Sequence, residues 1–145
     1  MVLEHGDGRT LSLSTVQLDV ARLRQILCFE RTLRAQAPSG CPPEQVATAH
    51  VAALAASGLR AGEVEAPLAL LRRFAANRAL TRRLLEHLAG LEASTATDPA
   101  ATEAEVRRRL DELEASLVAR EDAATRAVLE AHQAEILSLF AVALP

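Results

Sequence analysis

The sequence predicts an all-α protein: an antiparallel helical bundle of four to five helices behind a short non-helical arm. Ala, Leu, Glu and Arg, all strong helix formers, dominate the 145 residues. Apolar residues recur every three or four positions through several long segments. Most of the six glycines and six prolines lie between these segments or at their ends. Because half of the residues are hydrophobic, we expect one core and a single domain over residues 14–145.

The N-terminal segment, residues 1–13, does not have a helical pattern. Residues 10–13 alternate between polar and apolar side chains, and Gly6-Asp7-Gly8 before them is a turn signal. An extended arm, a small hairpin and a disordered tail all fit this pattern. The first helix is then expected from Ser14, where Ser14 and Gln17 match a capping box, to about Ala37.

Proline and glycine set the bounds expected for the next two helices. The second helix starts at Pro42 or Pro43, where the missing N–H of proline costs nothing, and ends before Gly58. The third covers roughly residues 63–92, with Pro67 in its first turns. Its expected buried face carries six large apolar residues, namely Leu70, Leu71, Phe74, Leu84, Leu88 and Leu91.

The last third of the chain is expected to form two helices. Asp98-Pro99 is a strong start signal, because aspartate caps helices and proline suits the first helical position. One helix from Pro99 to Val142 would be about 66 Å long at about 1.5 Å per residue, far longer than its packing partners. We therefore expect a break near Arg120-Glu121-Asp122, where the charges suit a C-terminus followed by an N-terminus.

Composition excludes several chemistries. The chain has no lysine, so it offers neither a Schiff base nor a phosphate-loop lysine, and its exclusive use of arginine is typical of a GC-rich bacterial genome. Residues 1–92 carry eleven arginines against nine acidic residues, whereas residues 93–145 carry five against ten. This balance and the scarcity of aromatics argue against nucleic acid as the main partner.

Two histidines lie on expected apolar faces. His50 is four residues from both Val46 and Leu54, and His132 lies between Leu129 and Ile136. One hypothesis is a metal, haem or small-molecule site that uses both histidines, with Cys28 and Asn77 as further candidates. The simpler interpretation is two hydrogen-bonded histidines at the edge of the core. No pair of His or Cys residues has metal-ligand spacing, and we expect no cofactor.

Five arginines cluster on the third helix, at Arg72, Arg73, Arg78, Arg82 and Arg83. They are candidates for binding phosphate, nucleic acid or an acidic partner. Pairing with the acidic fourth helix of the same chain is the interpretation we favour.

The C-terminal run from Ile136 to Pro145 is apolar on nearly every side. A helix of this kind is either enclosed by its own domain or used in an interface. The run is too short to span a bilayer and lacks basic flanks. The residues we expect to form an interface, if it is not enclosed, are Ile136, Leu137, Leu139, Phe140 and Leu144.

No catalytic motif occurs in the sequence, neither a Gly-x-Ser-x-Gly elbow nor a cysteine with activating neighbours. We therefore expect a non-enzymatic interaction or structural module that docks on another protein or on a second copy. Ligand binding through the histidines and anion binding through the arginines are the alternatives. The absence of a signal peptide and of a transmembrane run suggests the cytoplasm, or the cell envelope if a leader has been removed.

Overall fold

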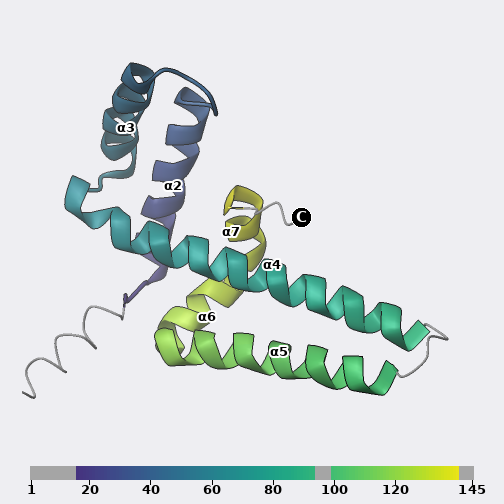
Figure 1. Ribbon diagram of the computed structural model, residues 1–145. Helices are drawn as coiled ribbons and strands as arrows, with labels where there is room; N and C mark the ends of the chain where they lie inside the picture. Colours follow the sequence, from purple (N-terminus) through teal and green to yellow (C-terminus); the bar gives the residue numbers. More distant parts are fainter. Residues whose placement is uncertain (1–15, 94–98, 141–145) are drawn as a thin grey trace, which may run out of the picture.

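The computed structural model describes residues 16–93 and 99–140, and every regular element within these two ranges is a helix. The predicted all-α class is confirmed (Figure 1). In chain order the elements are α2 (Val20–Gln36), α3 (Pro43–Ser57), the short 3-10 helix η1 (Ala61–Glu63), α4 (Glu65–Ala93), α5 (Pro99–Arg120), α6 (Ala123–Ala131) and α7 (Gln133–Phe140).

The main helix contacts form two antiparallel pairs, α2 with α3 and α4 with α5. Helices α2 and α3 lie side by side, and α5 runs back along the C-terminal half of α4 (Figure 1). Helix α6 turns away from the end of α5, and α7 then packs against both α2 and α4. The distal part of the α4–α5 pair therefore extends beyond the other helices, and each of these two helices has sides that none of the other described helices covers (Figure 1).

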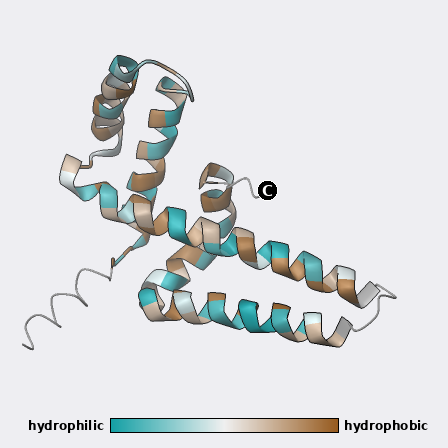
Figure 2. Ribbon diagram, in the orientation of Figure 1, coloured by the Kyte–Doolittle hydropathy of each residue, from teal (hydrophilic) through white to brown (hydrophobic). Residues whose placement is uncertain are grey.

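The core lies where α2, α4, α6 and α7 meet. Helices α6 and α7 contribute fully enclosed side chains, although together they span only 17 residues. Figure 2 shows α7 as mostly hydrophobic and α5, which has more open sides, as mostly hydrophilic. Among the described residues, no helix combines the length and the apolar character needed to cross a bilayer. The largest apolar side chains that are fully buried are Leu23, Ile26, Leu27, Phe29, Leu70, Leu71, Phe74, Leu129 and Ile136.

The first helix begins later than the capping-box pattern predicted. Residues 16–19 are not helical, and α2 starts at Val20 with Asp19 as its N-cap. The Asp19 carboxylate accepts a hydrogen bond from the amide of Arg22 at 2.7 Å, which satisfies one free N–H of the first turn. The amide of Leu18 donates instead to the buried Thr125 hydroxyl on α6, at 3.2 Å. This tertiary hydrogen bond holds the segment before α2 outside the helix. Ser14 and the predicted arm of residues 1–13 lie outside the described residues.

The boundaries set by proline and glycine are confirmed. Pro43 is the first residue of α3, and Gly58 ends that helix with a φ of 77°, in the left-handed region that glycine adopts without strain. The Gly58 amide donates to the Leu54 carbonyl at 3.0 Å. Pro67 lies in the first turn of α4, and α5 starts at Pro99 as predicted.

The predicted break between α5 and α6 is confirmed, and a second break follows it. Helix α5 ends at Arg120, and the Asp122 carboxylate caps α6 by accepting from the Thr125 amide at 2.7 Å. The sequence indicated one further helix, but the chain leaves helical geometry again at His132. The His132 ring Nδ1 lies 3.0 Å from the Val128 carbonyl oxygen. This ring caps the end of α6, so that α7 forms a separate helix.

Candidate functional site

Two of the residues expected to form an interface if the C-terminal run was not enclosed, Ile136 and Phe140, are enclosed in the structure. Ile136 is fully buried and Phe140 is 4% exposed, and both belong to the core of this chain. Leu137 and Leu139 are partly buried against the same core. The side of α7 that carries Ile136 and Phe140 is enclosed because α7 packs against both α2 and α4. Leu144 lies outside the described residues.

The His50 imidazole makes an aromatic packing contact with a neighbouring helix. The ring meets Phe29 of α2 edge-to-face, with ring centroids 5.3 Å apart and an interplanar angle of 83°. His50 is half-buried on α3, so this contact joins the first pair of helices. Edge-to-face geometry of this kind is typical of aromatic packing.

The other metal-ligand candidates do not converge on His50. His132 caps α6 through its ring nitrogen, and the Cys28 sulfur lies 3.7 Å from the Ala56 carbonyl oxygen. Asn77 contacts α5, where its amide donates to the Leu113 carbonyl at 2.9 Å. Within residues 16–93 and 99–140, no group of three or more His, Cys, Asp or Glu side chains is arranged to hold a metal ion.

The arginine cluster of α4 divides into two sets. Arg73 pairs with Glu121 at 3.5 Å, and Arg78 lies 3.7 Å from Glu114 and 3.6 Å from Glu130. These contacts include the pairing with α5 that we favoured from the sequence, through Glu114. The other partners lie at the α5–α6 junction (Glu121) and on α6 (Glu130). The second set consists of Arg72, Arg82 and Arg83, which are not fully buried and make no ion pair with any other described residue.

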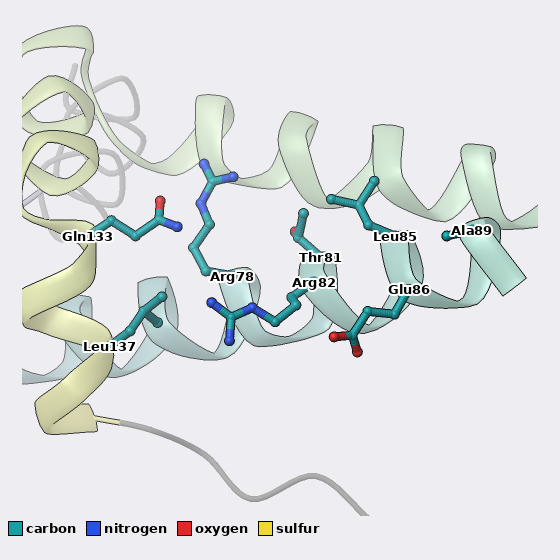
Figure 3. Close-up of a pocket in the computed structure, with 8 residues that line it drawn as sticks. All are labelled: Arg78, Thr81, Arg82, Leu85, Glu86, Ala89, Gln133 and Leu137. Carbon is teal, nitrogen blue, oxygen red and sulfur yellow. The ribbon is translucent and has the colours of Figure 1, made fainter.

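A groove of about 450 Å³ runs along α4 beside α7 (Figure 3). Gln133 and Leu137 project toward α4, while Arg82 extends along α4 toward Leu137 (Figure 3). Leu85, which is 50% exposed, and Ala89 continue the groove toward the end of α4. An exposed leucine beside an unpaired arginine is typical of a surface that binds an amphipathic partner. We call this surface the α4–α7 groove, and it is lined by Arg78, Thr81, Arg82, Leu85, Glu86, Ala89, Gln133 and Leu137.

Comparison with family models, with curated proteins and with solved structures gives no match for this chain. No activity can therefore be transferred to it from a relative, and its function has to be inferred from the surfaces themselves.

Glu121 is the residue of chemical interest that the sequence did not single out as a site. Its side chain is 2% exposed, and one of its two carboxylate oxygens has no hydrogen-bond partner in the described part of the chain. Burial raises the pKa of this carboxyl above its ordinary value, against the opposing effect of the Arg73 guanidinium. The sequence indicated Glu121 only as an acidic residue near the start of a helix. Its burial could not be predicted, because it depends on α4 lying across the α5–α6 junction.

The raised pKa of Glu121 predicts a definite dependence of stability on pH. The pKa of Glu121 in the folded state exceeds the ordinary value of 4.5, so the folded state favours the protonated carboxyl. The stabilisation that this gives is fully present below pH 4.5. It is then lost as the pH rises through the raised pKa. A glutamine side chain at this position would imitate the protonated carboxyl at every pH. We therefore expect Glu121→Gln to gain stability relative to the wild type between acidic and neutral pH, measured by urea unfolding at a series of pH values.

The difference in free energy of unfolding between the wild type and the variant, followed against pH, reports the titration of Glu121 alone. All other titrating groups are common to both proteins. Parallel curves would show that burial does not perturb this carboxyl. A wild type that gains stability over the variant as the pH rises would show that the ion pair with Arg73 outweighs the cost of desolvation.

Proposed function

We propose that this chain is a non-enzymatic interaction module that pairs with a second copy of itself. The observation that carries the proposal is the α4–α7 groove, where a half-exposed leucine adjoins an arginine without an ion-pair partner among the described residues. A complementary surface occurs on the same molecule, on the outer side of α5. A chain that displays both complementary surfaces can bind its own copy.

The complementary surface is a stripe of exposed residues along α5. Ala104, Asp111, Ala115 and Val118 are separated by seven, four and three positions, so they share one side of the helix. Val118 is 46% exposed, and Asp111 makes no ion pair with another described residue. The stripe carries Asp111 and also Arg108, which pairs with Glu105 and Glu112. The groove carries Arg82 and Glu86, so each surface offers an apolar part and charges of both signs. We call this surface the α5 stripe.

The two surfaces are also of similar length. The groove extends along α4 from Arg78 to Ala89, about 16 Å, and the stripe from Ala104 to Val118 covers about 21 Å. If α5 of one copy lies in the groove of the other, two-fold symmetry repeats the contact. The two protruding α4–α5 pairs would then complete a four-helix bundle, in which each helix gains the neighbours it lacks in one chain.

The experiment is to measure the solution mass by light scattering after size-exclusion chromatography, over a wide range of concentrations. We expect a dimer of the 15.5 kDa chain, and Leu85→Glu should convert it to a monomer because it places a charge on the apolar floor. Val51→Glu is the matched control, since Val51 is 67% exposed on α3, away from both surfaces. A wild type that stays monomeric at every concentration would overturn the proposal.

Charge exchange tests the pairing of the groove with the stripe more sharply. Either Arg82→Asp or Asp111→Arg alone should weaken the dimer, because two like charges would then meet across the interface. The double variant should restore it. Weakening by both single changes without rescue would place these residues outside a common contact and contradict the proposed pairing.

A further inference from the structure

A second groove, of about 330 Å³, lies between α4 and α5, the two helices that run side by side in Figure 1. We call it the α4–α5 groove, and it shares no lining residue with the α4–α7 groove. Part of its wall is apolar: Leu80 of α4 is 41% exposed, and Leu113 and Leu117 line the groove from α5. The volume is at the small end of the range for ligand sites, which suits a small molecule.

Three charged residues line this groove, and a ligand can reach the two basic ones. The Arg73 side chain is 37% exposed and Arg120 is exposed, whereas the Glu121 side chain is only 2% exposed. Burial raises the pKa of the Glu121 carboxyl while the Arg73 and Arg120 guanidinium groups lower it, so both groups lie near this carboxyl. The accessible charge in this part of the groove is therefore positive.

The charges that line the groove leave one guanidinium without a counter-charge. Arg73 forms an ion pair with Glu121 at 3.5 Å, and Arg120 makes no ion pair with any other described residue. The exposed Ser116, one helical turn before Arg120, adds a hydroxyl donor. Because a guanidinium matches a carboxylate through two parallel N–H···O bonds, a ligand with a single carboxylate would balance the groove.

We propose that the α4–α5 groove binds a free fatty acid of medium chain length. Its carboxylate would accept hydrogen bonds from Arg120 and from the exposed part of Arg73. Its hydrocarbon chain would lie on Leu80 and Leu113 and remove their exposed surface from water. An amine of the same length would instead face two guanidinium groups and no acidic group within reach, which disfavours it.

The test is a titration of the full chain with octanoate at neutral pH, monitored by calorimetry and by amide chemical shifts. Three further probes separate the contributions: acetate lacks the chain, octylamine carries the opposite charge, and octanol carries none. We expect saturable binding of octanoate, with shifts at residues 73–80 and 113–121, and at least about tenfold weaker binding of the other probes. Absence of octanoate binding overturns the proposal. Octanol or acetate binding as tightly as octanoate overturns it too, since the groove would then not recognise both parts of the ligand.

Two variants in the groove test the assignment of the basic group and of the apolar wall. Arg120→Gln removes the guanidinium that has no ion pair and should weaken octanoate binding by about tenfold. Its matched control is Arg72→Gln, at an exposed arginine outside the groove that also makes no ion pair with a described residue. Leu80→Glu places a negative charge on the apolar wall and should weaken binding by at least about tenfold.

The matched control for Leu80→Glu is Leu85→Glu, at a half-exposed leucine of α4 that lines only the α4–α7 groove. Octanoate binding does not require the proposed dimer, so Leu85→Glu should dissociate the dimer and keep full affinity for octanoate. Circular dichroism and thermal unfolding establish that each variant is folded. Full affinity in both groove variants, or equal weakening in the two controls, contradicts the proposal.

Discussion

Ile136→Ala should lower the free energy of unfolding by about 2–5 kcal/mol, measured by urea unfolding. Ile136 is fully buried on α7, so the substitution removes apolar atoms from the core and leaves a cavity that the neighbouring helices can only partly close. The matched control is Leu85→Ala in the α4–α7 groove. Leu85 is 50% exposed, and we expect its replacement to change stability by no more than about 0.5 kcal/mol.

The pair of variants distinguishes the two roles that the sequence allowed for the apolar C-terminal run. Loss of stability in Ile136→Ala, with no change in solution mass beyond that caused by unfolding, is the result expected of a core residue. An Ile136→Ala protein that unfolds like the wild type but associates less would show that α7 is part of an interface. Leu85→Ala should show the reverse pattern, with weaker association and unchanged stability.

The helix boundaries that the sequence predicted correctly depend on local chemistry. Proline fits only the first turn of a helix, so Pro43 and Pro99 mark starts whatever surrounds them. Gly58 ends α3 because glycine adopts a positive φ freely, and Asp122 caps α6 with its own carboxylate. Each signal involves atoms within four residues along the chain, and short spacings of this kind can be read without a structure.

The wrong or missing predictions concern contacts between distant segments. The start of α2 depends on the Leu18 amide reaching Thr125, which is 107 residues away in the sequence. The buried state of Glu121 and the grooves beside α4 depend on how α4 crosses its neighbours. Asn77 could be recognised as a polar residue in an apolar stripe, but its place beside Glu121 in one groove could not. A periodic pattern identifies the inner side of a helix, and it does not identify which helix covers that side.

Phe29→Ala should destabilise the fold by about 3–5 kcal/mol, the largest effect we expect from a single truncation on α2. Phe29 is 1% exposed, and its ring lies edge-to-face with His50 of α3. His50→Ala should cost about 1 kcal/mol, because the imidazole is only half-buried. In a double-mutant cycle the two rings should show a coupling of about 0.5–1.5 kcal/mol, the usual contribution of such a pair beyond buried area.

This cycle decides whether His50 acts as a packing residue or as a ligand to a metal or haem. A packing histidine couples to Phe29, and its loss changes unfolding without changing the affinity for added zinc or haem. A ligand histidine would give negligible coupling to Phe29 and a large loss of affinity. The edge-to-face ring and the separate hydrogen bond of His132 to the Val128 carbonyl both favour packing, since each imidazole already has a structural contact of its own.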